Sequence, residues 1–227
     1  MVTFGIIAEG ITDQYVIENI LRGFFADAAE EPVVNYVQPP LDATARGGQP
    51  PPAGWTLVFR ALADGEHRKA LQFNDFLVIQ VDTDVCEEKG FDVPRRENGR
   101  ELSPDELAAR VSARLRVCLG EDFCRAHGDK VIFAVAVHST ECWLLPLLYP
   151  DKKAQKITGC LEAANQALRR ANQKPLTSGD SKQIKAYDDA SRPYARRREL
   201  KKHQGRNPSL AWFVRQLGER FPDASFA

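Results

Sequence analysis

Short apolar runs alternate along the chain with segments in which apolar residues recur every three or four positions. Four runs, 2–8, 32–37, 76–81 and 131–137, have the length and β-branched composition of buried strands. The segments between them mostly have the spacing of amphipathic helices. Strands that alternate with helices in this way predict an α/β fold with a mainly parallel sheet flanked by helices.

The first half of the chain predicts two helices on the α/β pattern. Thr12 or Asp13 can cap a helix whose apolar residues continue to Phe24. Residues 55–72 predict a second helix, which Gly65 weakens because glycine is a poor helix former.

Two segments of the first half have loop composition. Residues 38–54 are rich in Pro and Gly, which predicts a surface loop near the site or a mobile flap. Residues 86–102 are polar and predict a crossover loop. The loop ends at a strong helix start, because Ser103 can cap and Pro104 suits the first helical position of a helix that continues to about Cys118.

The C-terminal third has helical spacing and no strand pattern. It predicts a helix over 152–171, a polar connection over 174–181 and a basic helix over 180–204 that Pro193 kinks or breaks. A last helix is predicted from Asn207.

Charge divides the chain into the same two parts. The chain has 227 residues, of which 43% are hydrophobic, and this is enough for a proper core. Residues 1–150 contain 14 Lys and Arg against 23 Asp and Glu, a net charge of −9, whereas residues 151–227 have +9. We therefore expect a core over 1–150 that gathers cations and a basic helical extension over 151–227 packed on it.

Cysteine use and the N-terminus bear on location. The five cysteines include no Cys-x-x-Cys pair, which argues against a disulfide framework and a zinc ribbon. Cys118 and Cys160 lie in helical patterns and are expected to be small core residues. The chain shows no basic leader before its first strand and no apolar run of the ~20 residues that span a bilayer. We expect a cytoplasmic protein with no membrane contact.

Acidic residues follow three of the predicted strands. Glu9 comes after the first, Asp82 and Asp84 after the third, and Glu141 shortly after the fourth. In an extended chain Asp82 and Asp84 would point to the same side, and a hard cation such as Mg²⁺ would relieve their repulsion. Because parallel strands end at one edge of a sheet, all four acids could converge there.

Each of these residues also has a structural explanation. Asp82 could cap a turn while Asp84 is solvated, and Glu9 and Glu141 could favour helix N-termini. His138 could be a ligand or general base, but a histidine at a strand end is more often simply hydrogen-bonded. Trp143 is better explained as core than as a base-stacking platform.

Basic residues concentrate in the predicted helix over 180–204. A charge run is usually a solvated face, but here the residues are dense and nearly unpaired along the sequence. We expect phosphate contacts from some of them, and the candidates are Lys182, Lys185, Arg196, Arg197 and Arg198.

The acidic motifs resemble those of the Toprim superfamily. The turn Glu-Gly-Ile-Thr-Asp at 9–13, followed by Asp82-Thr-Asp84 and Glu141, is most similar to small stand-alone bacterial Toprim-like proteins related to the OLD-family nucleases. Those proteins share a Glu-Gly-x-[Thr/Ser]-[Glu/Asp] turn and a later Asp-x-Asp. The resemblance covers about residues 1–150 and implies a Rossmann-like Toprim core.

The resemblance implies roles for particular residues. Glu9 takes the family's glutamate position, and Asp82 and Asp84 take its metal-binding aspartates, so these three form the implied catalytic set. Asp13 stands where OLD-type nucleases more often have Glu, and Glu141 matches a less regular acidic position. The implied metal ligands are therefore Glu9, Asp13, Asp82, Asp84 and Glu141.

Members of the superfamily cut, join or synthesise phosphodiester bonds with Mg²⁺. The chain shows neither the tyrosine-bearing domain of topoisomerases nor the extra modules of primases, so the resemblance implies a nuclease that uses Mg²⁺ or Mn²⁺ on DNA or RNA. It further implies anti-phage defence or a toxin-like system, an ABC-type or AAA-type ATPase partner, and allows a homodimer. Two alternatives stay open, namely a non-catalytic regulatory subunit of an ATPase and a phosphatase or nucleotide hydrolase for small substrates.

Overall fold

The computed structural model describes residues 1–28, 31–40, 54–179 and 181–226. Within these residues one larger sheet has the order β2-β1-β3-β6, and all its strands are parallel. The strands are β1 (Thr3–Ile7), β2 (Val33–Gln38), β3 (Phe76–Asp82) and β6 (Val131–Ala136). The expected α/β class with a parallel sheet is confirmed. Most of the predicted loop 38–54 lies outside the described residues.

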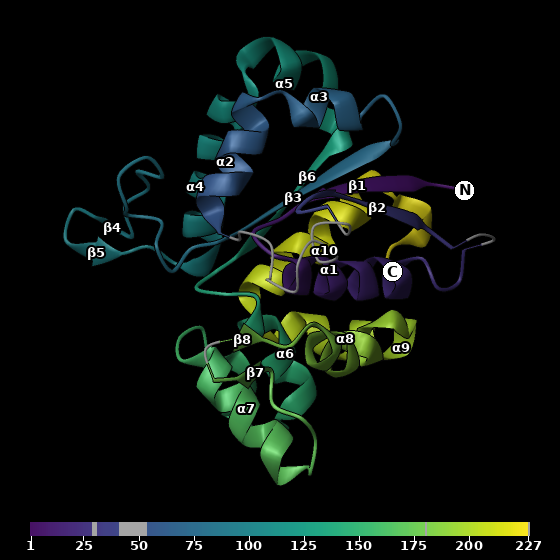
Figure 1. Cartoon of the computed structure of the whole chain (residues 1–227), viewed down its shortest axis with the longest axis vertical. Helices are drawn as coiled ribbons and strands as arrows, with labels where there is room; N and C mark the ends of the chain where they lie inside the picture. The colour runs from purple at the N-terminus through teal and green to yellow at the C-terminus, as the bar shows by residue number, and fades with distance from the viewer. Residues whose placement is uncertain (29–30, 41–53, 180, 227) are drawn as a thin grey trace.

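Helices cover both faces of this sheet (Figure 1). One face carries α2 (Trp55–Ala63), α3 (Glu66–Ala70), α4 (Pro104–Leu119) and α5 (Glu121–His127). The other carries α1 (Ile11–Phe24), α6 (Glu141–Leu148), α8 (Ile184–Ser191), α9 (Arg197–His203) and α10 (Pro208–Arg220). Alternate residues of each strand serve the two faces: in β3, Val78 joins one hydrophobic cluster while Leu77 and Ile79 join the other.

Two helix predictions are confirmed by their boundary residues. Ser103 accepts a hydrogen bond from the Glu106 N–H, and Glu106 reaches back to the Ser103 N–H, so α4 begins with a complete capping box. Pro193 lies in the short 3-10 helix η4 (Arg192–Ala195), which separates α8 from α9.

Three other helix predictions are wrong at glycines. The cap of α1 is Gly10 rather than Thr12 or Asp13, which are inside the helix. The segment 55–72 forms two helices, because Gly65 adopts a left-handed conformation between them. Gly159 does the same between the 3-10 helix η3 (Lys152–Gln155) and α7 (Cys160–Arg170), so 152–171 is not one helix.

Two short hairpins occupy segments expected to be irregular. The polar loop 86–102 contains β4 (Arg96–Glu97) and β5 (Arg100–Glu101), which project from the molecule in Figure 1. The connection after α7 contains β7 (Thr177–Ser178) and β8 (Ser181–Lys182), so the basic segment begins as a strand and not as a helix.

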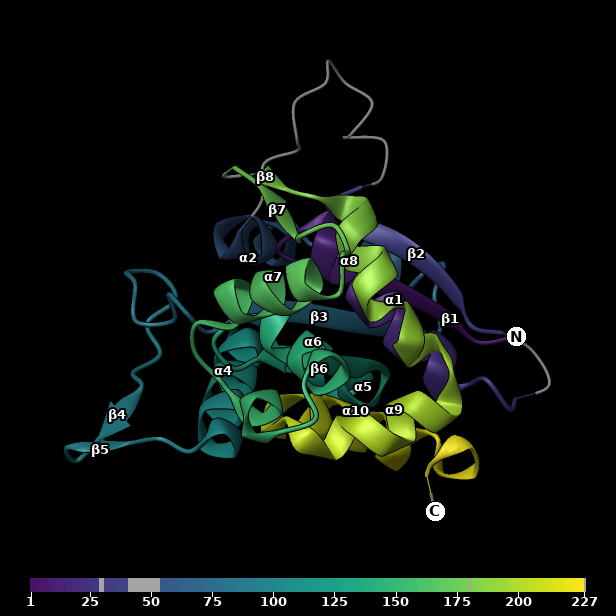
Figure 2. The same cartoon turned by 90° about the horizontal axis from the view of Figure 1, so that it is seen from below.

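The C-terminal helices share the hydrophobic core of the sheet. α1 packs against α8, η4 and α9, and Figure 2 shows α1 beside α8. α10 packs against β6. One buried cluster joins residues of β1, such as Phe4, to residues of α10, such as Phe213. The boundary expected near residue 150 therefore does not separate two cores.

Side chains of α10 cover the free edge of β6. Gln216 accepts a hydrogen bond from the Phe133 N–H (3.2 Å) and donates one to the Phe133 carbonyl (2.7 Å), as a neighbouring strand would. Ser209 accepts from the Val137 N–H at 3.2 Å. These contacts satisfy groups that would otherwise form an exposed strand edge.

Cysteine pairing differs from the sequence expectation. Cys142 in α6 and Cys160 in α7 form a disulfide, although the sequence argued against a disulfide framework. The two residues are 18 positions apart, and only the packing of α6 on α7 brings them together. Cys118 is half-buried rather than fully in the core. In the part of the chain that the structure describes, no helix has both the length and the apolar character to cross a membrane.

Candidate functional site

The acids converge at the carboxyl edge of the sheet. Glu9 follows β1, Asp82 is the last residue of β3, and Glu141 is the first residue of α6, which follows β6. Asp13 lies in the first turn of α1. Because these strands are parallel, their carboxyl ends meet on one side, where open α/β sheets bind ligands.

Hydrogen bonds link Glu9 to Asp82 through the backbone. The Asp82 N–H donates to Glu9 Oε1 at 2.8 Å, and the Glu9 N–H donates to Gln80 Oε1 at 3.0 Å. Gln80 Nε2 in turn donates to Asp82 Oδ1 at 2.8 Å. The same oxygen accepts the N–H (3.1 Å) and the hydroxyl (3.0 Å) of Thr140. Gln80 and Thr140 thus fix the orientation of a buried carboxylate.

Glu141 has a lysine partner. Lys182, from the β7–β8 hairpin, places Nζ 2.9 Å from Glu141 Oε1, and the Tyr187 hydroxyl donates to that oxygen. Lys182 Nζ also lies 5.4 Å from the centre of the Tyr187 ring. The Glu141 side chain is only 3% exposed, so the ion pair is shielded from water on the acid's side.

Asp13 is the least satisfied of these acids. It is 2% exposed, and its Oδ1 has no hydrogen-bond partner within the described residues. A buried carboxylate oxygen without a partner is costly, because burial removes its water without replacing it. This oxygen is free to accept a proton, an N–H donor or a cation.

Burial and mutual repulsion raise three of the acidic pKa values. The pKa of Glu9 is raised to about 8, mainly by burial. The hydrogen bond from the Asp82 N–H lowers this pKa, whereas the negative charges of Asp13 and Asp84 raise it. Burial likewise raises the pKa of Asp13 and raises that of Asp82 well above its usual value. The charges of Asp13 and Glu9 add to the shift of Asp82.

Glu141 shifts in the other direction. Burial alone would raise its pKa, but the charge of Lys182 together with hydrogen bonds from Ser139, Tyr187 and Lys182 holds it at about 2. The neighbouring acids in turn hold the pKa of Lys182 above its usual value. Glu141 and Lys182 are therefore an ionised pair inside a cluster that has more acids than cations.

Asp84 does not share the buried environment of Asp82. The expectation of an extended chain through both residues is wrong, because β3 ends at Asp82 and Asp84 is in the turn that follows. The Thr83 and Asp84 N–H groups both donate to the His138 carbonyl, which closes this turn. Asp82 is buried and Asp84 is exposed, so Asp84 lies at the rim and acts on Glu9 only through its charge.

His138 and Trp143 are structural in their visible contacts. His138 uses its backbone to bond Thr83, while its Nδ1 has no partner among the described residues. Trp143 is fully buried, stacks on Phe213 at 5.6 Å and donates to Ser209 Oγ at 2.8 Å. The interpretation of Trp143 as core agrees with these contacts.

The basic residues singled out from the sequence are not a free face. Lys182 pairs with Glu141, and Lys185 lies 3.3 Å from Asp189 in α8. Arg197 bonds Asp27 at 2.9 Å and donates to the carbonyls of Phe24, Ala224 and Ser225, so its donors hold the C-terminus in place. The expectation of nearly unpaired cations is wrong for these three. The other two are exposed: Arg196 directly precedes α9, and Arg198 lies in its first turn.

The described residues contain no ready-made metal centre. In residues 1–28, 31–40, 54–179 and 181–226, no three His, Cys, Asp or Glu side chains are grouped closely enough to hold an ion. The donor set nevertheless suits a hard cation, because Asp13 Oδ1 is unpartnered and Glu9, Asp13 and Asp82 repel one another. An ion would require these side chains to turn toward each other.

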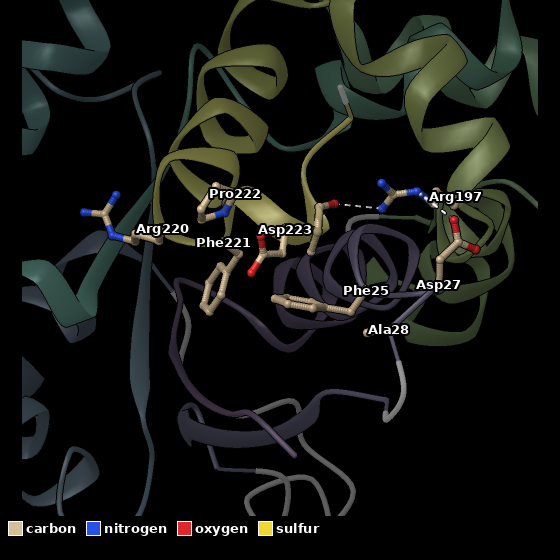
Figure 3. A pocket seen from close by; sticks show the side chains of 9 residues that line it. Phe25, Asp27, Ala28, Arg197, Arg220, Phe221, Pro222 and Asp223 are labelled. Atoms are coloured by element: carbon tan, nitrogen blue, oxygen red, sulfur yellow. Dashed lines mark hydrogen bonds and ion pairs between the residues drawn. The ribbon is translucent and has the colours of Figure 1, made fainter.

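A cavity of about 390 Å³ lies elsewhere, near the C-terminus (Figure 3). It is lined by Phe25 and Asp27, which follow α1, and by Phe221 and Pro222, which follow α10. The guanidinium of Arg220 at its wall donates to the Val131 and Asp129 carbonyls. This cavity is next to the amino ends of the strands and is not part of the acidic site.

Comparisons of the chain with family models, with curated proteins and with solved structures give no match. The resemblance to Toprim proteins therefore rests on the acidic motifs alone and stays a prediction.

Sequence reasoning missed two site residues, Gln80, which lies within the apolar run of β3, and Tyr187. Tyr187 lies in α8, where its neighbours have an ordinary amphipathic pattern, and nothing local marks it as a partner of Glu141. Lys182 was chosen for its charge, but its partner was not foreseen, because it is 41 positions from Glu141 in the chain.

Proposed function

We propose that the protein is a metal-dependent nuclease that hydrolyses phosphodiester bonds of DNA or RNA. The observation that carries the proposal is the convergence of Glu9, Asp13, Asp82 and Glu141 at the carboxyl edge of a parallel sheet. Clustered buried acids destabilise a fold when nothing offsets them, so their presence favours a site that binds a cation. The Toprim motifs, which include the same residues, support it.

Mg²⁺ or Mn²⁺ fits the oxygen donors of this edge. Glu9, Asp13 and Asp82 would hold the ion, and Asp84 at the rim could reach it through water. When bound, such an ion polarises a phosphoryl oxygen and lowers the pKa of a coordinated water.

The chain's own residues prepare the site. Gln80 and Thr140 orient Asp82 through their hydrogen bonds to Oδ1. Lys182 keeps Glu141 ionised, and its side chain, which is 41% exposed, offsets part of the negative charge that an approaching phosphate anion would meet. Glu9, with a pKa near 8, can take up or release a proton near neutral pH.

The wider roles implied by the resemblance remain part of the proposal. On this view the nuclease acts in anti-phage defence or a toxin-like system, in the cytoplasm, beside an ABC-type or AAA-type ATPase. Co-purification with such an ATPase from the native host would test the partnership.

The test is cleavage of labelled DNA and RNA in the presence of Mg²⁺ or Mn²⁺. We expect Asp82→Asn and Glu9→Gln to lower the rate at least ~100-fold, since loss of a metal ligand removes more than the 10–100-fold typical of outer contacts. Asp129→Asn, at an exposed position before β6, is the matched control and should cleave normally. Wild-type rates in Asp82→Asn would refute the catalytic assignment.

A regulatory binding subunit is the second candidate. It is favoured by the Lys182–Glu141 pair, which already neutralises part of the cluster without a metal. On this view the acids are structural, and neither Mg²⁺ nor Mn²⁺ would stabilise the protein.

A further inference from the structure

A positively charged surface lies beside the site on the α7 lobe, which we define as residues 151–182 with η3, α7 and the β7–β8 hairpin. This segment contains seven Lys and Arg residues against three Asp and Glu. One of the seven, Lys182, is inside the site. The other six are exposed and form no ion pair with a described carboxylate: Lys152, Lys153, Lys156, Arg169, Arg170 and Lys174. Figure 1 shows α7 projecting away from the sheet.

Three cations of α8, η4 and α9 contrast with these six. Lys185 and Arg192 pair with acids one turn away, and Arg197 is occupied by the C-terminus. Arg196, Arg198 and Lys202 are exposed as well, but among the described residues the α7 lobe has the larger set of exposed cations that form no ion pair with a described carboxylate, and the sequence did not single these residues out.

Helix stability explains only part of this charge. Arg169 and Arg170 lie in the last turn of α7, where positive charge is favourable. Lys156 lies close to the amino end of α7, where the helix dipole disfavours positive charge. Lys152 and Lys153 belong to η3, and Lys153 Nζ lies 5.3 Å from the centre of the Tyr149 ring. A surface that retains cations at both ends of a helix suits an extended polyanion.

Three contacts hold the lobe against the site. Cys160 at the start of α7 is disulfide-bonded to Cys142, the residue after Glu141. The Tyr149 hydroxyl donates to the Ala163 carbonyl at 2.9 Å, and Lys182 pairs with Glu141. An anion bound to the lobe is thus held at a set position relative to the acids.

We propose that the α7 lobe is the nucleic-acid-binding element of the protein and guides the phosphate backbone to the acidic site. The guiding role rests on the proposed nuclease function, whereas the binding of nucleic acid by the lobe can be tested without it. α7 has 11 residues and a length of about 16 Å, which matches about five phosphates along one strand of a duplex at 3.4 Å each. The six cations contact phosphates and carry no base specificity.

Binding, measured without cleavage, tests the proposal. Fluorescence anisotropy in EDTA follows labelled duplex DNA, single-stranded DNA and RNA of about 20 nucleotides over a range of salt concentrations. One variant is Lys152→Gln/Lys153→Gln/Lys156→Gln, and a second is Arg169→Gln/Arg170→Gln/Lys174→Gln. The control, Lys69→Gln/Arg125→Gln/Lys130→Gln, removes the same net charge from exposed positions in and beside α3 and α5 on the other face.

We expect each lobe variant to bind at least tenfold more weakly than wild type. The slope of log affinity against log salt should fall by roughly 0.9 for each lost duplex contact. The control should stay within about twofold of wild type, since its cations lie off the proposed path. Melting temperatures near that of wild type show that the variants are folded.

Several results would overturn the proposal. These are wild-type binding by both lobe variants, equal weakening by the control, no binding of any nucleic acid, or equally tight binding of labelled polyglutamate. The nuclease function is judged separately. If the protein never cleaves nucleic acid but the lobe variants bind it more weakly, the nuclease proposal fails and the binding role of the lobe stands. If the protein cleaves but the lobe variants bind as tightly as wild type, only the binding role of the lobe fails.

Discussion

The two ends of the sheet are built from opposite residue types. At the amino end, Phe4, Phe25, Phe76 and Phe221 form a cluster of rings with centroids 4.7 to 5.9 Å apart. At the carboxyl end, the same strands lead to Glu9, Asp82 and the other buried acids. Helix α1 joins the ends, because it begins beside Glu9 and finishes beside Phe25.

The comparison separates stability from function. Rings that fill space and leave no polar group unpaired lower the free energy of the fold. Buried carboxylates whose pKa values are raised do the reverse at neutral pH, and such costs are usually found at sites that bind a ligand. We infer that the residues at the amino end of the sheet stabilise the fold, whereas the buried acids at the carboxyl end lower its stability and form a binding site.

The largest change in stability is expected when a ring is removed from the aromatic cluster at the amino end of the sheet. Phe4 is fully buried in the ring cluster, so Phe4→Ala should lower the free energy of unfolding by about 3–5 kcal/mol. Urea denaturation measures it. Phe73→Ala, at a residue that is 79% exposed, is the control and should change stability by less than about 0.5 kcal/mol. A loss under about 1 kcal/mol in Phe4→Ala would contradict the assignment of stability to this end.

Adding a divalent ion should stabilise the carboxyl end. At a free Mn²⁺ or Mg²⁺ concentration 100 times the Kd, binding to the folded state contributes about 2.7 kcal/mol. Thermal unfolding should therefore shift upward in wild type and much less in Asp13→Asn or Asp82→Asn, which lose an anionic ligand. KCl at equal ionic strength controls for screening. Equal shifts in wild type and both variants would show that the ion binds elsewhere.

A smaller effect is expected from the protonation of Glu9. Its folded-state pKa of about 8 lies above the usual 4.5, so the folded protein holds this proton at pH values where the unfolded chain has lost it. The associated stability is present below about pH 4.5 and is lost as pH rises through about 8. In EDTA, the melting temperature of Glu9→Gln relative to wild type should rise between these pH values. A difference that does not change with pH would disprove the raised pKa.

The smallest effect is expected from His67, in α3 just before β3. It is buried, both ring nitrogens lack a partner among the described residues, and burial lowers its pKa below 6.5. Unlike Glu9, it makes the fold less stable as pH falls below about 6.5, because the unfolded chain takes up the proton first. His67→Phe keeps the ring contact with Phe123. In this variant the melting temperature should fall less steeply than in wild type as pH decreases below about 6.5. If the melting temperatures of His67→Phe and wild type fall equally with decreasing pH, other groups cause the pH dependence.

Local sequence was sufficient for the four strands of the main sheet and for the acids at or after their carboxyl ends. The apolar runs, the Ser103 capping box and the break at Pro193 depend on neighbours within a few residues, so the sequence predicts them. The positions of Glu9, Asp82 and Glu141 at one edge follow from the parallel sheet, whose strands those runs define. Predictions that crossed a glycine, as at Gly65 and Gly159, were wrong, because a left-handed residue ends a helix without changing the apolar spacing around it.

The partners of those acids depend on tertiary contacts. Lys182 reaches Glu141 only because its segment forms a hairpin instead of the expected helix, and the Cys142–Cys160 bond exists only because α7 folds back on α6. Asp84 lies at the exposed rim of the cluster, because the Thr83 and Asp84 N–H groups donate to the His138 carbonyl and turn the chain after β3. Sequence spacing describes forces between near neighbours, whereas the charge and burial that set a pKa come from groups tens of residues away, which only the folded chain brings within a few ångströms.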